Sequence, residues 1–232
     1  MTKKNSINAQ EVAKFHQQAH AWWDQKGPLK TLHQINPTRM HWIQSHTSLA
    51  GLKILDLGCG GGILSEALAQ QGALVTGLDA DEASIQVAQH HAHTSRLNIN
   101  YQCCAVENFQ HDPFDIIMCL EMLEHVDDPA FVLSHCARLL KPGGLLFLST
   151  INRTPIAYLE AIVMAEYVLK LLPKQTHDYQ KCIRPSEMAK MLRDLNFDVK
   201  NIQGLGYNPI TQTAYLRSNV QVNYLMLAQK YS

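Results

Sequence analysis

The stretch KILDLGCGGGI, Lys53–Ile63, decides how this 232-residue chain folds. After Lys53, its first strand-length segment is apolar except for Asp56, which is typical of a strand buried on both faces. The glycines that follow, from Gly58 to Gly62, predict a tight turn whose backbone approaches a ligand without Cβ atoms in the way. A helix is expected directly behind this turn. The stretch therefore predicts the first βα unit of an α/β sheet.

Beyond this stretch, short apolar runs alternate with helix-length segments, as a parallel sheet with crossover helices requires. Seven strands are expected, the last of them antiparallel, at 53–57, 74–78, 100–104, 115–120, 145–150, 197–202 and 220–228. Helices are expected at 63–71, 82–93, 130–140 and 185–195. Residues 1–50 lack the alternation and are expected to form a helical cap on a domain of residues 51–232, with an apolar lid inserted at about 154–182. Ligands of such sheets bind at the carboxyl ends of the strands, so site residues are expected directly after them.

The composition narrows the class of protein. Twenty basic residues balance twenty acidic ones, and only 17% of residues are charged, so no excess positive charge favours nucleic acid as a partner. The six cysteines include no CxxC pair, and the first residues have no apolar core typical of a signal peptide, which favours reduced thiols in the cytoplasm. No run of 18 uncharged apolar residues is present, so any membrane contact is expected to be peripheral.

Two features indicate a nucleoside cofactor. Asp79 ends the second expected strand, 21 residues after Gly58, where a carboxylate accepts hydrogen bonds from ribose hydroxyls. A dinucleotide fingerprint needs glycine at position 63, but Ile63 stands there. The pattern from Asp56 through Gly58 and Gly60 instead resembles the first motif of class I S-adenosylmethionine-dependent methyltransferases. That resemblance implies S-adenosylmethionine as cofactor and a Rossmann-like fold.

The loop after the fourth strand carries a second cluster. Glu121, Glu124 and His125 place two carboxylates and an imidazole within five residues, and oxygen and nitrogen donors suit a divalent cation such as Mg²⁺. The other interpretation is that these are hydrogen-bonded loop residues, with His125 acting alone as a base. If the methyl acceptor is a phenol, with a pKa near 10, its full ionisation at pH 7 costs about 4 kcal/mol. Methyl transfer to it therefore needs either a cation that binds the ionised oxygen or His125 as a base that removes the proton. Both interpretations place this loop beside the nucleophile.

Motifs across most of the chain are similar to the bacterial ubiquinone-biosynthesis O-methyltransferase family. They are Trp22–Asp24, Leu32–Arg39, the glycine loop with Ile63 and Leu64, Glu121–Val126, Lys141–Gly144, Ser149–Arg153, Thr176–Asp178 and Tyr207–Pro209. The family methylates a polyprenylated hydroxyphenol and 3-demethylubiquinol, so the resemblance implies a polyprenylated phenol or quinol as substrate, and a place in a ubiquinone-biosynthesis complex.

The same resemblance places Arg39, Gly58, Asp79 and Leu120 at cofactor-contacting positions, and relatives usually have methionine or serine where Leu120 stands. A guanidinium such as that of Arg39 is able to clamp a carboxylate with paired hydrogen bonds. The resemblance extends to mitochondrial relatives and implies a divalent cation at the positions of Glu121, Glu124 and His125. Trp22 and Trp23 are expected to be core aromatics of the cap, the alternative being that they line the substrate pocket.

A last segment, Ile156–Leu172, reads as a helix with charge confined to an arc of about 120°. It is expected either to be a buried lid or to rest in the headgroup region of a bilayer and admit an oily substrate. Two other functions stay open at this stage. One is methylation of another lipidic or aromatic acceptor, which has no use for the Glu121–His125 cluster, and the other is a non-catalytic cofactor-binding scaffold.

Overall fold

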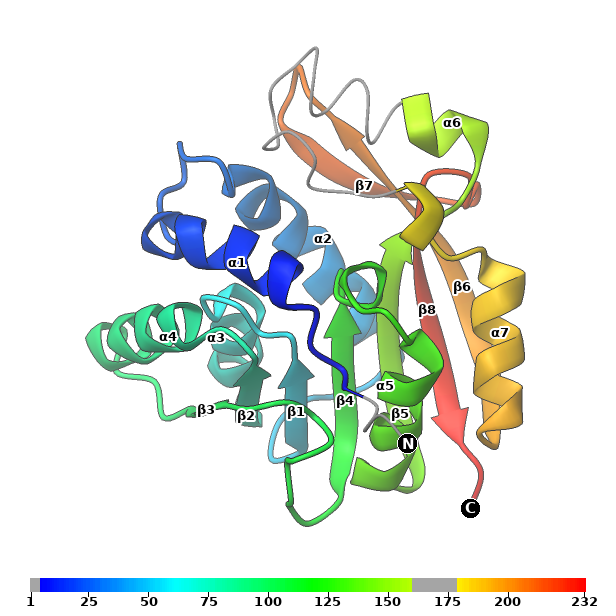
Figure 1. The fold of residues 1–232 in the computed structure, drawn as a ribbon, viewed down its shortest axis with the longest axis horizontal. Helices are drawn as coiled ribbons and strands as arrows, with labels where there is room; N and C mark the ends of the chain where they lie inside the picture. Colours follow the sequence, from blue (N-terminus) through cyan, green and yellow to red (C-terminus); the bar gives the residue numbers. More distant parts are fainter. Residues whose placement is uncertain (1–4, 160–178) are drawn as a thin grey trace.

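One eight-stranded sheet organises the protein in a computed structural model, which describes residues 5–159 and 179–232 (Figure 1). The strand order is β3-β2-β1-β4-β5-β8-β6-β7. The strands are β1 (Lys53–Leu57), β2 (Leu74–Asp79), β3 (Asn100–Cys103), β4 (Phe114–Leu120), β5 (Leu140–Ile151), β6 (Phe197–Asn208), β7 (Thr213–Arg217) and β8 (Asn223–Lys230). The first five strands pair in parallel, whereas β8 pairs antiparallel with both β5 and β6.

Helices cover both faces of the sheet and the carboxyl ends of β1, β2 and β4. They are α1 (Ala9–Gln18), α2 (Lys30–His46), α3 (Ile63–Gln70), α4 (Glu82–Thr94), α5 (Pro129–Leu139), α6 (Pro155–Ala157) and α7 (Pro185–Asp194). Short 3₁₀ turns occur at Ala19–Ala21, Leu123–His125 and Tyr179–Lys181. In Figure 1, α1 and α2 (blue) lie above the arrowheads of β1 and β2.

The alternation of side chains along β1 explains its apolar residues, Ile54, Leu55 and Leu57. Ile54 packs on one face with Ile43 of α2 and Leu68 of α3. Leu55 packs on the other face, in a core that includes residues of α5 and α7. Successive strand residues point to opposite faces, so a central parallel strand needs apolar side chains at nearly every position.

The sequence predicts the parallel half of the sheet closely, and the α/β architecture with a mostly parallel sheet and an antiparallel last strand is confirmed. The strand count is wrong, because the sheet has eight strands rather than seven. The missed strand, β7, pairs only with β6 at the sheet edge, and no residue of it is buried. An exposed edge strand needs no apolar run, so hydrophobic patterning does not reveal it.

Two further boundaries differ. β5 begins at Leu140 rather than at residue 145, so Lys141–Gly144 belongs to the strand. β6 runs to Asn208 rather than ending at residue 202, because its second half pairs with β7.

The expected apolar helix Ile156–Leu172 lies largely outside the described residues, as does most of the expected lid at 154–182. The structure describes the start of this segment up to residue 159 and its end from residue 179. The start contains α6, in which the Thr154 hydroxyl caps the first turn by accepting a hydrogen bond from the Ala157 amide. Within residues 5–159 and 179–232, no helix combines the length and apolar character needed to cross a bilayer.

Candidate active site

A cavity of about 530 Å³ lies at the carboxyl ends of β1, β2 and β4. Asp56, Gly58, Gly60, Asp79 and Leu120 line it from the strand ends. Residues of α1 and α2 close it from above, and Tyr207 and Tyr215 of the β6–β7 hairpin also contribute. All of the predicted site residues except Glu124 are among the residues that line this cavity.

The glycine loop has no room for side chains. Gly58 and Gly60 have φ angles of +77° and +51°, a region that side chains disfavour. A Cβ atom on Gly58 would lie 2.7 Å from Met122 Cγ, and one on Gly60 would lie 2.3 Å from the Trp22 ring. The glycines are therefore required both by the turn and by what packs on it.

Trp22 is the cap residue that packs on this loop. It is buried, its Nε1 donates to Ser84 Oγ at 2.9 Å, and it also lines the cavity. Both interpretations of Trp22 therefore hold, since it is a core aromatic and also lines the cavity. Its place over Gly60 and Gly61 gives the cap a direct contact with the expected cofactor loop.

Asp79 ties the two expected cofactor segments together. Its Oδ2 accepts from the Gly60 amide at 2.8 Å and its Oδ1 accepts from the Asp81 amide at 2.9 Å. Burial raises the pKa of this carboxyl above its ordinary value. Each carboxylate oxygen has two lone pairs, so both oxygens retain capacity for the hydroxyls of a ribose, and the residue fits the predicted role.

Asp56 lies deeper, with only 3% of its surface exposed. Its Oδ2 accepts from Ser65 Oγ at 2.6 Å, which ties β1 to α3. Burial, with the nearby negative charge of Asp79, raises the pKa of Asp56 to about 6.

Arg39 of α2 is buried and pairs with Glu121, with 2.9 Å between Nη2 and Oε1. Glu121 is itself held by Ser149, whose hydroxyl donates to Oε1 at 2.7 Å. Arg39 Nε is buried without a hydrogen-bond partner. A buried guanidinium N–H without an acceptor is costly, so this side chain fits the predicted contact with the carboxylate of a bound amino acid.

His125 lies in the 3₁₀ turn after β4 and contacts α1. Its Nδ1 is 2.9 Å from Glu11 Oε2, and the Phe15 ring meets the imidazole edge-on, with centroids 5.1 Å apart. The hydrogen bond with His125 is the main reason that the pKa of Glu11 is lowered to about 2. The sequence did not identify Glu11, because a glutamate on an amphipathic helix looks like any solvated charge.

The three predicted metal ligands do not converge in this arrangement. Glu121 faces Arg39 and Ser149, His125 faces Glu11, and Glu124 Oε2 accepts from Thr150 Oγ1 at 2.8 Å. In the part of the chain that the structure describes, no group of three or more His, Cys, Asp or Glu side chains is placed to hold a metal ion. The residues as placed do not fit a shared cation.

Comparisons with known proteins identify methyltransferases as similar to this chain. A family described as "Methyltransferase domain" matches residues 55–148. Among solved structures, the magnesium protoporphyrin IX methyltransferase of Synechocystis with bound SAH has a TM-score of 0.67 at 21% identity, covering 94% of each chain. A SAM-dependent methyltransferase of Methanosarcina mazei gives a TM-score of 0.63 at 21% identity, covering 82% of this chain and 97% of that one. The fold and site define a class I S-adenosylmethionine-dependent methyltransferase.

Relatives with higher identity specify the family. The ubiquinone biosynthesis O-methyltransferase of Stutzerimonas stutzeri is 52% identical over 98% of this chain and 100% of its own length. The protein of the same name from Pseudomonas aeruginosa is 50% identical over 97% of this chain and 99% of its own. The chain belongs to the ubiquinone biosynthesis O-methyltransferase family.

Proposed function

We propose that this chain transfers a methyl group from S-adenosylmethionine to a hydroxyl of a polyprenylated phenol or quinol, 2-polyprenyl-6-hydroxyphenol and 3-demethylubiquinol being the substrates. One observation carries the proposal. A single cavity is lined by the cofactor-loop residues, by His125 and by apolar side chains of several elements, namely Ile7, Val12, Phe15, Val126, Ile151 and Val222. Family membership supports the same substrates, because the relatives are named for ubiquinone biosynthesis.

The chain's own residues divide the work of holding the cofactor. Asp79 accepts from the ribose hydroxyls, the Gly58 and Gly60 backbone allows close approach, and Arg39 donates to the amino-acid carboxylate. Asp56, bonded to Ser65 of α3, and Leu120, at the end of β4, line the same cavity. When bound, S-adenosylmethionine supplies an electrophilic methyl group on a sulfonium. Much of the rate then comes from alignment, since holding two reactants in position is worth about 7–11 kcal/mol.

His125 is the proposed general base. The phenolic hydroxyl is almost fully protonated at pH 7, and a positioned imidazole that removes its proton contributes roughly 10²–10⁴ in rate. Glu121 supports catalysis indirectly by fixing Arg39, and Glu124 by bracing the loop against Thr150 of β5. No step in this scheme runs through a metal ion.

The test of the substrate class is an acceptor comparison. Purified protein and S-adenosylmethionine are incubated with a prenylated catechol, the same catechol without its prenyl chain, and a prenylated aniline, each with Mg²⁺ and with a chelator. We expect a methyl ether and S-adenosylhomocysteine, with a higher kcat/KM for the prenylated catechol. Preferential methylation of nitrogen, or no product in either condition, would contradict the proposal.

The same proposal includes a peripheral contact with the membrane. It also places the protein in the cytoplasm, in an assembly of ubiquinone-biosynthesis enzymes. Three large apolar residues at the start of the lid are exposed, Ile156, Tyr158 and Leu159, and Ile210 of the β6–β7 turn is 91% exposed. Figure 1 shows α6 and β7 at the same end of the molecule. Apolar side chains gathered at one end suit a substrate that resides in a bilayer.

A further inference from the structure

We infer that Glu11 is a positioning residue for methyl transfer: carried on α1, its carboxylate orients His125 and fixes which imidazole nitrogen accepts the substrate proton. The inference rests on the proposed function, because it assumes that His125 is the base. It adds a residue from outside the cofactor-binding sheet to the catalytic arrangement.

The first support is the geometry of the pair. Glu11 Oε2 and His125 Nδ1 are 2.9 Å apart, and the two side chains are only 13% and 12% exposed. Both residues line the cavity. A hydrogen bond shielded from solvent in this way is stronger and better defined than one on an open surface.

The chemistry of the pair settles the tautomer. A glutamate side chain is a carboxylate at neutral pH, and a carboxylate only accepts hydrogen bonds, so the contact of Glu11 Oε2 at 2.9 Å needs a donor on the imidazole. His125 Nδ1 must then carry the proton, and the lone pair of the neutral ring lies on Nε2. During the reaction Nε2 takes the phenolic proton, and the Glu11 carboxylate remains ionised beside the resulting imidazolium.

Two neighbours restrict the pair further. Lys14 Nζ donates to the other carboxylate oxygen, Glu11 Oε1, at 2.9 Å. Phe15, one turn along the same helix face, meets the imidazole edge-on with an interplanar angle of 90°. The ring is therefore oriented by a hydrogen bond at one atom and by an aromatic contact, both supplied by α1.

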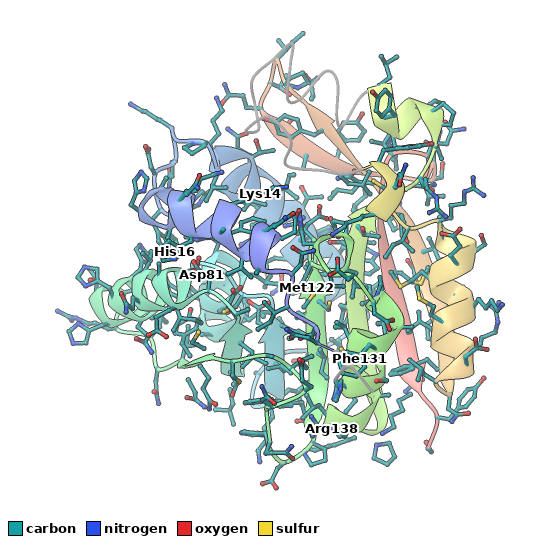
Figure 2. The ribbon with its side chains drawn as sticks, viewed as in Figure 1. Lys14, His16, Asp81, Met122, Phe131 and Arg138 are labelled. Atoms are coloured by element: carbon teal, nitrogen blue, oxygen red, sulfur yellow. The ribbon has the colours of Figure 1, made fainter. Side chains whose placement is uncertain are left out.

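The arrangement makes the base depend on a helix that is docked by side chains. No residue of α1 is fully buried. Besides Glu11, its polar contacts to the body include His16 Nδ1 with Asp81 Oδ1 at 2.8 Å, and Figure 2 shows this pair between α1 and the start of α4. Glu11 thus has two separable effects, docking the helix and orienting His125.

A double-mutant cycle separates these effects. Glu11→Ala, His125→Ala and the double variant are compared with wild type for kcat, KM and cofactor affinity. His16→Ala is the matched control, because it removes a docking contact of the same helix without touching His125. Alanine is the strongest helix former, so α1 is expected to persist in each variant.

We expect Glu11→Ala to lower kcat about tenfold or more, as part of the roughly 10²–10⁴ that the base contributes. In the His125→Ala background the same change should have little further effect, because a residue that acts through its partner is not additive with it. His16→Ala should leave kcat within about twofold of wild type. An unchanged kcat in Glu11→Ala, additive losses, or an equal loss in His16→Ala would overturn the inference.

A second measurement does not need turnover. Nitrogen-15 NMR of the histidine side chains reports which ring nitrogen carries the proton, and the His125→Ala spectrum identifies its signals among the twelve histidines. Wild type should show His125 protonated at Nδ1, and Glu11→Ala should lose that preference. If wild type methylates no phenol yet shows this tautomer, the proposed function fails and with it the role in methyl transfer, whereas the orientation of His125 by Glu11 stands. If His125 shows the other tautomer in wild type, the inference is wrong.

Discussion

Asp56 is a site residue whose surroundings disfavour its charged form. It is buried and its pKa is raised from 3.8 to about 6. Between these two values the unfolded chain releases its proton before the folded one does, so this carboxyl lowers stability as pH rises. The full cost, roughly 3 kcal/mol, is present above about pH 7 and absent below about pH 4. A carboxylate kept in so unfavourable a place is consistent with its expected role beneath the cofactor.

Replacing this carboxylate should stabilise the protein without its ligand. Asp56→Asn removes the titration and keeps an oxygen that accepts from Ser65. Thermal unfolding of both proteins from pH 4 to pH 8 should give similar Tm values at the acid end and a higher Tm for the variant at the alkaline end. A Tm difference that does not grow with pH would show that ionisation of Asp56 is not the cause.

Gly60 is required for two reasons, the lack of room beside Trp22 and the positive φ of its backbone, and the effects of the two can be measured separately. Gly60→Ala places a Cβ atom 2.3 Å from Trp22 at a φ of +51°, so Trp22 must move away from the loop. We expect cofactor affinity to fall at least about tenfold, with a loss of stability of about 1–3 kcal/mol. Calorimetric titration with S-adenosylhomocysteine and thermal unfolding measure the two effects.

Gly51→Ala is the matched control for this change. Gly51 has a φ of +75° but no atom within 4 Å of an added Cβ. This variant should lose about 1 kcal/mol of stability and keep the wild-type affinity. Equal losses of affinity in the two variants would mean that backbone strain, rather than the Trp22 contact, is responsible.

At the scale of elements, the sequence is most informative where burial is greatest. β1, β2 and β4 are central strands whose apolar runs and following loops place Asp56, Asp79 and Leu120 at one edge of the sheet. The contacts that complete the site come from α1 and α2, and they cross long distances in sequence: Arg39 reaches Glu121, and Glu11 reaches His125. Patterns in a single chain carry the period of each helix but not its docking direction, so they indicate neither the contact of Glu11 with His125 nor the separate partners of Glu121, Glu124 and His125.

The docking of α1 leads to a prediction about its motion. Because no residue of α1 is fully buried and the helix lines the cavity, its opening costs less free energy than that of the sheet. Cofactor binding should therefore slow amide hydrogen exchange in residues 9–18 more than in β8, which lies on the far side of β5. Mass spectrometry with and without S-adenosylhomocysteine measures this. Unchanged exchange in α1 alongside slowed exchange at the glycine loop would mean that α1 does not close over the ligand.

At the scale of the whole molecule, the low charge content is explained by where the apolar residues lie. Both faces of the sheet are covered by apolar cores, and the exposed apolar residues of α6 and the β6–β7 turn lie at one end (Figure 1). The opposite end, where β8 finishes, carries Tyr231 at 56% exposure. The two ends provide a direct comparison for the proposed membrane contact.

A liposome flotation assay makes that comparison. Leu159→Asp with Ile210→Asp should reduce the fraction of protein that floats with anionic liposomes, because buried apolar area contributes to the binding energy at about 25 cal/mol per Å². Tyr231→Asp, at the opposite end, should float like wild type. Equal flotation of all three proteins would remove the lipid-facing interpretation.

The most direct test of the account as a whole follows the methyl group. Wild type and Asp79→Ala are incubated with S-adenosylmethionine labelled in its methyl group and with a prenylated catechol, and the products are identified by mass spectrometry. Wild type should place the label on a catechol oxygen, with one S-adenosylhomocysteine formed per methyl ether, and Asp79→Ala should form far less product at the same cofactor concentration. Cofactor binding without any labelled ether from wild type, or full activity of Asp79→Ala, would contradict the proposed function.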